Sequence, residues 1–248
     1  MRNTFSILLA FAISLGGTSL SAQSRSGFSL GAAMIGGQSA YAGLSKTQRI
    51  VPSLSYEMGN LKIGLPDGVS YQVLERGALT LSVGVTPNLR PFDEAKSSAL
   101  SGMERSLSVD TTVGAALTIA RGSTVRLKYG SEITNENGGQ VATLSFSQFI
   151  PIAGQPVILS AGAKWQDAKR SKYVYGVYAN EVTSTRAAYD PGSTVVPYVS
   201  VNTFFDLTDR VNAFVNVSAN FLPNNVTDSP IVSEKTTLTA ILGLAYSF

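Results

Sequence analysis

Apolar and polar side chains alternate with a period of two through most of the chain, and this pattern constrains the fold more than any other feature. In segment 236–248, every second residue from Leu238 to Phe248 is apolar, and most of the residues between them are small or polar. Successive side chains of a β-strand point to opposite faces, so this alternation predicts strands with one apolar face. No segment shows a convincing helical period, and we expect an all-β chain.

About twelve segments carry the alternation. We place them near 27–37, 48–58, 60–66, 69–75, 78–90, 105–120, 123–134, 138–150, 156–167, 195–206, 210–222 and 236–248. Short connections, such as 59–60 and 121–122, tend to alternate with longer ones near 38–47, 91–104, 168–194 and 223–235. Short periplasmic turns, longer extracellular loops and an even strand number are typical of bacterial outer-membrane barrels. The sequence therefore predicts a closed antiparallel transmembrane β-barrel of about 12 strands.

The composition supports a barrel that contacts lipid. Hydrophobic residues make up 44% of the chain and charged residues 14%, whereas soluble globular proteins carry about 25% charged residues. Beyond the N-terminal segment, no apolar run reaches the roughly 18 residues that a transmembrane helix needs. A soluble β-sandwich would need polar outward faces, but one face of nearly every segment here is apolar.

The N-terminus has the form of a secretion signal. Met1-Arg2 gives a positive start, the run from Phe5 to Leu15 is apolar, and small or polar residues follow to Ala22. These three parts define a cleavable signal peptide. We assign residues 1–22 to the signal and residues 23–248 to the barrel. We expect the protein in the outer membrane of a Gram-negative bacterium.

Two residue types are absent from the sequence, and this limits its chemistry. The chain contains no histidine and no cysteine, so it lacks the residues of a Ser-His-Asp triad, a Cys-His pair or a His-ligated zinc site. We assign no catalytic, cofactor-binding or metal residues and expect no enzyme, although a hydrolase that uses carboxylates alone is a formal alternative. The net charge of +3 is spread along the chain, which gives nucleic-acid binding little support.

The alternation places six charged side chains on inward, polar faces: Glu57, Lys62, Asp110, Arg126, Lys128 and Lys164. A charge costs about 2–4 kcal/mol on the lipid face at mid-depth, but little in a wet or paired lumen. These charges can line a solute path and set its ion preference, or they can fill a narrow barrel as paired side chains. We favour the filled barrel, in which Arg126 and Lys128 pair with carboxylates such as Glu57 or Asp110.

The longest loop begins with clustered charges and continues with tyrosines. The charges are Asp167, Lys169, Arg170 and Lys172, and the tyrosines are Tyr173, Tyr175 and Tyr178. The cations can bind lipopolysaccharide phosphates, or they can form a solvated loop base, which we favour. The tyrosines can join an aromatic girdle or pack the loop into the barrel mouth.

The last strand ends on an aromatic residue, Phe248, with Tyr246 two residues before it. This ending resembles the terminal strand that the barrel-assembly machinery recognises in outer-membrane proteins. We therefore take Tyr246 and Phe248 as the assembly signal.

Several segments resemble the MltA-interacting protein / OmpV family. They are YGVYANE at 175–181, AYDPG at 188–192, TDSPIV at 227–232 and LGLAYSF at 242–248, with looser matches GFSLG at 27–31 and VPSLSYE at 51–57. In that family, Tyr-Gly-Val, Ala-Tyr-Asp, Asp-Ser-Pro-Ile-Val and Tyr-x-Phe elements occur in this order and at similar spacing. Asn224-Asn225 departs from the family's usual pattern, and the match is loose between about 90 and 150.

The resemblance implies a non-enzymatic outer-membrane barrel whose founding member is regarded as a scaffold that joins a murein-cleaving lytic transglycosylase to a murein synthase. Other members are linked to osmotic response and adhesion, and no catalytic residues exist to carry over. The expected partners are outer-membrane lipid and lipopolysaccharide, the barrel-assembly machinery, and a murein hydrolase and synthase. A passive small-solute channel is the alternative function. We interpret Asp228-Ser229-Pro230 as a turn that sets the entry into the last strand.

Overall fold

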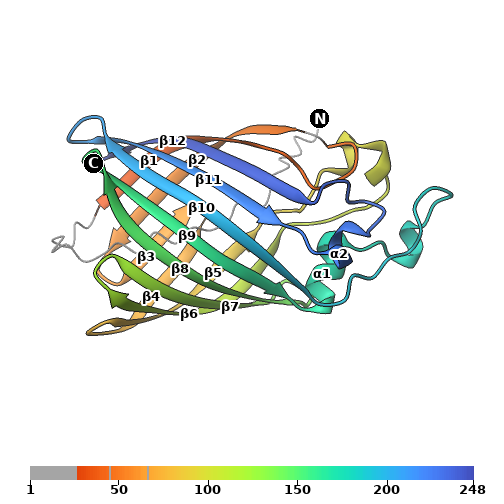
Figure 1. Cartoon of the computed structure of the whole chain (residues 1–248), viewed down its shortest axis with the longest axis horizontal. Helices are drawn as coiled ribbons and strands as arrows, with labels where there is room; N and C mark the ends of the chain where they lie inside the picture. The colour runs from red at the N-terminus through yellow and green to blue at the C-terminus, as the bar shows by residue number, and fades with distance from the viewer. Residues whose placement is uncertain (1–26, 45, 66) are drawn as a thin grey trace.

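The computed structural model describes residues 27–44, 46–65 and 67–248, which form a closed barrel of twelve antiparallel strands (Figure 1). The strands are β1 (Gly27–Gly37), β2 (Thr47–Met58), β3 (Leu61–Leu65), β4 (Gly68–Arg76), β5 (Leu79–Asn88), β6 (Ser108–Ala120), β7 (Ser123–Glu132), β8 (Gln140–Ile152), β9 (Gln155–Gln166), β10 (Thr194–Asp206), β11 (Val211–Phe221) and β12 (Thr236–Ser247). Each strand pairs with its neighbours in the chain, and β1 pairs with β12 to close the barrel. The predicted fold class is confirmed, and most strand ends lie within two residues of the expected positions.

Short helices interrupt the long connections, and we did not predict them from the sequence. They are the α-helices α1 (Ala168–Tyr175) and α2 (Asn224–Thr227), and the 3-10 helices η1 (Glu94–Lys96), η2 (Ser98–Leu100) and η3 (Ala179–Glu181). None of the helices in the described part of the chain is long and apolar enough to cross a membrane. The predicted signal peptide, residues 1–22, lies outside the described residues.

The outer face of the barrel is apolar. Leu238, Leu242 and Leu244 on β12 expose 49%, 50% and 51% of their surface, although large apolar residues of soluble proteins lie mostly inside. Leu30 and Met34 on β1, which lie opposite Tyr246 and Leu242 of β12, are exposed in the same way, at 49% and 40%. Such a face is stable against lipid, which agrees with the predicted outward set of β12.

One aromatic side chain breaks the alternation and takes an inward position. Phe214 on β11 lies opposite Gly243 on β12, between neighbours whose side chains face outward. A Cβ atom at Gly243 would come within 2.2 Å of the Phe214 ring. The glycine therefore leaves the space that this inward ring needs.

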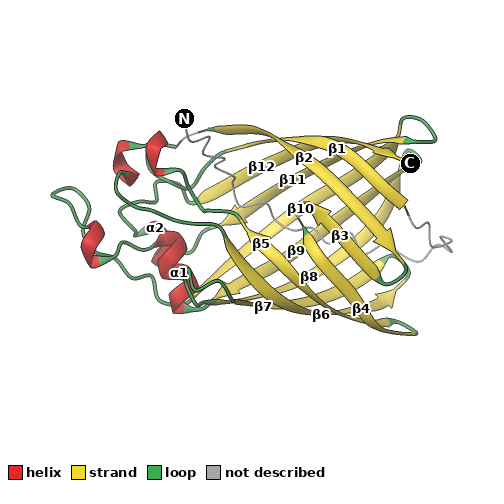
Figure 2. Cartoon of the chain, turned by 180° about the vertical axis from the view of Figure 1, so that it is seen from behind, coloured by secondary structure: helices red, strands yellow, loops and turns green. Residues whose placement is uncertain are grey.

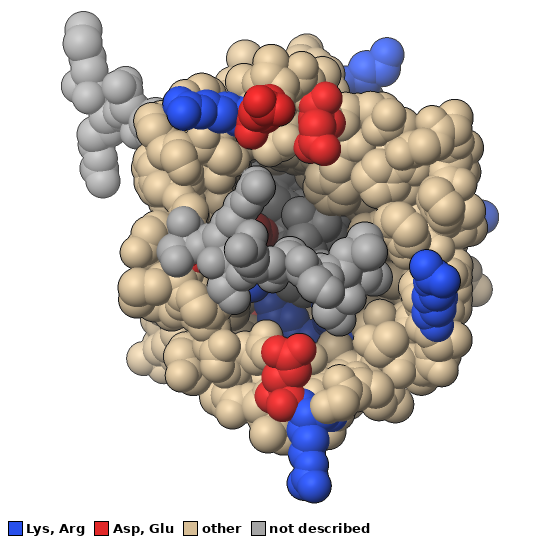
Figure 3. Space-filling model, turned by 90° about the vertical axis from the view of Figure 1, so that its left-hand side faces the viewer, with Lys and Arg blue, Asp and Glu red and all other residues tan. Residues whose placement is uncertain are grey.

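The end of the barrel that carries the C-terminus is built from tight turns. Gly59, Gly77 and Gly122 in these turns have positive φ angles of 55°, 59° and 77°, a conformation that glycine adopts without steric cost. Figure 3 looks onto this end and shows basic and acidic side chains spaced around its rim. In the usual orientation of such barrels, short turns face the periplasm.

At the opposite end, the long connections fold together into a cap (Figure 2). We define the cap as residues 38–44, 89–107, 167–193 and 222–235. Apolar residues from all four segments form one buried cluster: Ala40, Tyr41, Leu44, Phe92, Leu100, Met103, Tyr173, Val174, Tyr175, Val177, Val226, Ile231 and Val232. The most deeply buried of them, including Leu100 and Ile231, have an exposure of 0%. The cap is therefore a folded unit with its own core, placed over the mouth of the barrel.

Candidate functional site in the barrel lumen

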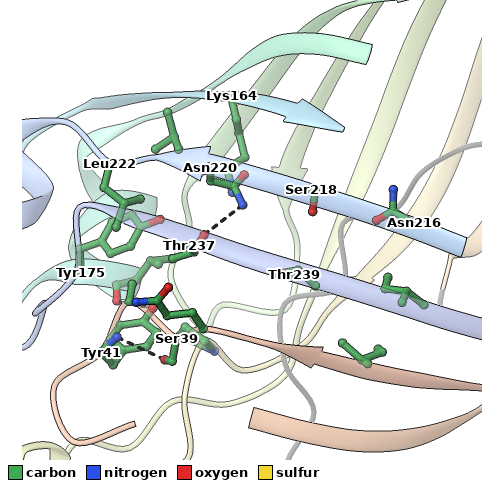
Figure 4. A pocket seen from close by; sticks show the side chains of 17 residues that line it. Ser39, Tyr41, Lys164, Tyr175, Asn216, Ser218, Asn220, Leu222, Thr237 and Thr239 are labelled. Carbon is green, nitrogen blue, oxygen red and sulfur yellow. Dashed lines mark hydrogen bonds between the residues drawn. The ribbon is translucent and has the colours of Figure 1, made fainter. Parts of the chain in front are cut away.

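A chamber lies inside the barrel beneath the cap (Figure 4). Its volume is about 90 Å³, which is room for several water molecules or one small solute. Inward-facing residues of β11 and β12 form much of its wall, and the cap forms its roof. The wall includes Asn216, Ser218, Asn220, Thr237 and Thr239, and the roof includes Tyr41, Val174, Tyr175 and Leu222.

The wall carries amides and hydroxyls in a fixed arrangement. Asn216 donates from Nδ2 to Asn202 Oδ1 over 2.7 Å, and Asn220 donates from Nδ2 to Thr237 Oγ1 over 3.1 Å (Figure 4). Amide and hydroxyl groups can each donate and accept hydrogen bonds. The wall can therefore bind the hydroxyl or carboxylate groups of a solute.

Lys164 gives the chamber its charge. This residue lies on β9 among inward-facing neighbours, and its side chain lines the chamber (Figure 4). The described lining residues include no carboxylate. The other described lining residues are uncharged, and beside the polar side chains they include the apolar Ile35, Val196 and Ile241.

Two tyrosines make the roof rigid and apolar. Tyr41 donates from its hydroxyl to the Val174 carbonyl over 3.1 Å, and its ring packs edge-on against Phe92 with 4.8 Å between the centroids. The Tyr41 and Tyr175 rings stack at 6.5 Å. Burial raises the pKa of Tyr41 well above its usual value and raises the pKa of Tyr175 to about 12, so both hydroxyls are neutral at physiological pH.

A buried arginine holds two cap segments together. The Arg105 guanidinium makes two hydrogen bonds to the Glu181 carboxylate, one of them 3.1 Å long, and donates to the Tyr173 carbonyl over 2.7 Å. It also lies 5.1–5.5 Å from the ring centroids of Phe92, Tyr173 and Tyr178. Paired carboxylate bonds and aromatic faces are the partners that best suit a planar guanidinium. We did not single out Arg105 or Glu181 from the sequence as a pair, although Glu181 lies in the family-like segment 175–181.

A second buried ion pair joins the cap to the barrel wall. Arg170 in α1 donates to both oxygens of Asp110 on β6, over 3.0 and 3.3 Å. From the sequence, Asp110 or Glu57 was expected to pair with Arg126 or Lys128, whereas Asp110 forms its hydrogen-bonded ion pair with Arg170. Glu57 instead bonds to Lys62 over 3.2 Å, and both of these side chains are about half exposed. The expectation placed partners within the lumen, but the strongest partner of Asp110 comes from the cap.

Arg126 and Lys128 lie on β7 at positions that alternate with the outward residues Leu127 and Tyr129. The Lys128 ammonium donates to Thr86 Oγ1 on β5 over 3.1 Å. These two cations are on the lumen side of a different wall from the chamber, whose lining includes neither of them. Their role in solute passage stays a prediction.

The start of the longest loop is folded rather than solvated. Asp167 accepts from the Arg170 backbone N–H over 2.8 Å and caps the start of α1, as Asp does at helix N-termini. Lys172 bonds to Asp190 over 3.0 Å, whereas Lys169 is exposed. The solvated-base interpretation is therefore wrong for Arg170. Of the two readings of the tyrosines, the observed burial of Tyr173 and Tyr175 supports packing into the mouth.

Ser229 connects the last segment of the cap to the end of α1. Its hydroxyl donates to the Tyr175 carbonyl over 2.5 Å, and the next apolar residue, Ile231, is fully buried in the cluster. The Asp228-Ser229-Pro230 segment thus forms a turn, as interpreted, but the turn also anchors α2 against α1. The described residues contain no cluster of three or more acidic, histidine or cysteine side chains that could hold a metal ion.

The fold, the apolar outer face and the polar lumen define this protein as an outer-membrane β-barrel. It belongs to the MltA-interacting protein MipA family, whose model matches residues 30–248. The recognised resemblance is thereby confirmed, and so is an outer-membrane location in a Gram-negative bacterium.

Named relatives and a solved structure agree with this assignment. The outer membrane protein YiaT of Escherichia coli (strain K12) is 24% identical over 225 residues, which cover 89% of this chain and 90% of YiaT. The MltA-interacting protein of the same strain is 24% identical over 161 residues, which cover 64% of this chain and 60% of that protein. An outer membrane channel from Pseudomonas putida F1 aligns with a TM-score of 0.50 and 13% identity, covering 92% of this chain and 97% of the channel. This structural likeness concerns the fold.

Proposed function

We propose that this protein is a non-enzymatic channel for small solutes, with an extracellular mouth closed by the folded cap. The observation that carries the proposal is the chamber inside the barrel, which is lined by both polar and apolar side chains. A lumen filled by paired side chains, which we favoured from the sequence, would leave no space of this kind. Because the cap roofs the chamber, a movement of the cap would connect the chamber with the exterior.

The lumen charges favour anions. The charged side chains that the alternation places inward comprise four cations, Lys62, Arg126, Lys128 and Lys164, and two acids, Glu57 and Asp110. Fixed positive charge in a confined path raises the local concentration of anions. We therefore expect a preference for chloride over potassium.

Current through purified protein in planar bilayers tests the proposal. We expect the wild type to open rarely, and Ile231→Ala, which creates a cavity in the cap core, to open more often. The reversal potential in a KCl gradient reports ion preference. A double Arg126→Gln, Lys128→Gln variant should lower the preference for chloride. Absence of current from both the wild type and Ile231→Ala would contradict the channel and favour the filled barrel.

A second candidate is a scaffold for murein-remodelling enzymes. It is supported by the name of a relative, the MltA-interacting protein, which is 24% identical to this chain. The tight turns at the periplasmic end offer little surface, because a stable protein interface buries about 800 Å² on each partner. Capture of a purified lytic transglycosylase or murein synthase by the barrel in lipid nanodiscs tests this candidate. Specific, saturable binding to either enzyme would support the scaffold function. Absence of binding to both enzymes would contradict the scaffold function and favour the channel.

A further inference from the structure

We propose that the barrel has a lateral window between β2 and β5, through which small apolar solutes pass between the chamber and the outer leaflet of the membrane. This inference rests on the proposed channel function and adds to it a second opening and a class of solute. Three features carry it: a gap in the strand pairing, an apolar path behind the gap, and a charged contact across the gap.

The gap arises because the hairpin of β3 and β4 is short. β3 pairs with Leu54–Met58 of β2, and β4 pairs with β5 only as far as Val85. In the part of the chain that the structure describes, residues 47–53 of β2 and 86–88 of β5 therefore have a paired strand on one side alone. Figure 2 shows β2 and β5 continuing toward the cap beyond the end of β3. The window is the interruption of the sheet between these two edges.

Both edges of the window carry a proline. Pro52 lies on β2 and Pro87 on β5, and proline, which has no backbone N–H, is confined within sheets to edge strands, strand ends and bulges. An unpaired N–H is costly in lipid, so a proline on each edge lowers the cost of leaving the window open. Ile50 on β2 exposes 78% of its surface, against 40% for its partner Met34 on β1, because no strand lies on its other side.

The window lies at the level of the lipid-facing surface. On the β1 side, Met34 and Ile50 are outward, apolar and exposed. On the β6 side, Leu107 precedes Ser108, the partner of Asn88 at the end of β5, and exposes 49% of its surface. The apolar outer face therefore extends along both sides of the window to its cap end. A solute that leaves the barrel here enters hydrocarbon rather than water.

An apolar path leads from the window to the chamber. Val51 on the β2 edge lies opposite Ala33 of β1, which has an exposure of 6%. Further along β1, Ile35 lines the chamber opposite Ile241 of β12, and Pro91, which follows the end of β5, also lines it. Apolar side chains favour an apolar solute because its contact with water is lost. The volume of about 90 Å³ limits that solute to a short carbon skeleton.

A charged contact links the two sides of the window. Arg49 lies on the β2 edge, and Asp93 belongs to the cap segment that continues from the β5 edge. The two charges attract each other, and Asp93 also bonds to Lys96 over 3.7 Å. The attraction between Arg49 and Asp93 holds segment 89–93 across the window. This contact therefore keeps the window mostly closed, and its loss opens the path to the chamber.

Photolabelling of the full-length barrel in lipid vesicles tests the window. The probe is methylpropyldiazirine, a small apolar photolabel that partitions into the bilayer, and mass spectrometry locates the labelled residues. We expect Asp93→Asn and Arg49→Gln to raise the labelling of Ile35, an inward residue of the chamber, at least threefold. Lys96→Gln, which removes the other partner of Asp93, should leave this labelling at the wild-type level. The same labelling of Ile35 in the wild type and all three variants would overturn the proposal.

A chemical link across the window provides the sharper test. The chain contains no cysteine, so a short bismaleimide can join the two thiols of the double variant Arg49→Cys, Asp93→Cys. We expect strong labelling of Ile35 before linking and the loss of most of it afterwards. Thr112 faces inward on β6, which is paired on both sides, and should be labelled weakly in both forms. Labelling of Ile35 that persists after linking would show entry through the mouth and overturn the window.

Bilayer currents separate this inference from the channel proposal, because ions do not follow a path through hydrocarbon. Linking the double variant should leave its KCl current unchanged while it removes the labelling of Ile35. Lateral entry of the photolabel into a barrel that never conducts would retain the window and overturn the channel. Conduction by a barrel whose chamber is never labelled would retain the channel and overturn the window.

Discussion

Arg170 and Asp110 are 60 residues apart in the chain, yet their side chains form a two-bond ion pair where α1 meets the inner face of β6. Both side chains are buried, with exposures of 7% and 3%. The pair ties the cap to the wall of the barrel. Each buried charge is stabilised by the other. The removal of one side chain therefore leaves the other charge buried without its partner, which destabilises the fold.

Arg170→Ala should therefore lower the free energy of unfolding by about 3–5 kcal/mol. The midpoint of urea unfolding in lipid vesicles measures this. The matched control is Lys62→Ala, which removes an ion pair whose side chains are about half exposed and should cost less than about 1 kcal/mol. Similar losses in the two variants would mean that the cap pair does not hold the structure together.

The buried tyrosines predict that the cap loosens at alkaline pH. The folded-state pKa of Tyr175 is raised to about 12 by burial, whereas an unfolded tyrosine titrates near pH 10. The neutral Tyr175 therefore makes its full contribution to the stability of the folded cap below about pH 10. This contribution is lost as the pH rises toward 12. Tyrosinate absorbance at 295 nm, followed together with bilayer current, measures both events.

Tyr175→Phe provides the comparison for the alkaline transition. It removes the ionisable hydroxyl and keeps the ring, so we expect the opening to move to higher pH or to become smaller. The pKa of Tyr41 is also raised by burial. Ionisation of Tyr41 should therefore account for part of the alkaline transition that remains in Tyr175→Phe. An unchanged transition in the Phe variant would assign the effect to other groups.

The core of the cap should determine how often the mouth opens. Ile231 has an exposure of 0%, so Ile231→Ala should destabilise the closed cap by about 2–5 kcal/mol, since it removes buried methyl groups and leaves a cavity. Chymotrypsin cleavage of the cap measures this loss directly. Val182→Ala, at a residue 47% exposed in the same cap, should cleave at the wild-type rate. Equal cleavage of both variants would argue against a cap with a cooperative core.

The strands could be predicted from the sequence because their cause is local. Each strand has one face toward lipid and one toward the lumen. The alternation of apolar and polar residues along a segment such as 236–248 therefore predicts a strand without knowledge of its neighbours. Even the exception, Phe214, has a local explanation once its neighbour across the sheet, Gly243, is known.

The cap could not be predicted because its causes are distant. Its two buried ion pairs join residues 60 and 76 positions apart, and such distant contacts cannot be read from the local pattern of a sequence. Helix α1 has eight residues, too few for a stable isolated helix, so its packing against the cap core determines it. The same reason explains why inward carboxylates could be located but their partners could not.

The aromatic end of the chain should be needed for assembly. Phe248 donates its backbone N–H to the Phe28 carbonyl over 3.0 Å, and its ring lies 5.5 Å from that of Phe28 and 4.8 Å from that of Tyr246. We expect deletion of Phe248, or replacement of Tyr246 and Phe248 by alanine, to reduce the heat-modifiable protein in the outer membrane severalfold. Leu244→Ala, an outward change on the same strand, should have a smaller effect. Wild-type levels of heat-modifiable protein in the variant with both replacements would show that Tyr246 and Phe248 are not the assembly signal.

Arg105 should be irreplaceable by lysine in the cap. Its guanidinium satisfies the Glu181 carboxylate with two bonds and the Tyr173 carbonyl with a third, and it lies over three aromatic rings. Lysine keeps the charge but has no planar fork, so Arg105→Lys leaves part of a buried carboxylate unsatisfied.

We expect Arg105→Lys to cleave faster with chymotrypsin within the cap and to open more often in bilayers, with a loss of about 1–3 kcal/mol in cap stability. Because the pair is buried, with side-chain exposures of 2% and 6%, the loss should change little between 0.1 and about 1 M salt. Arg121→Lys, in an exposed turn at the other end of the barrel, is the control. A loss that disappears at high salt would show that Arg105 acts through long-range charge, whereas a loss independent of salt follows from the missing hydrogen bonds and ring contacts.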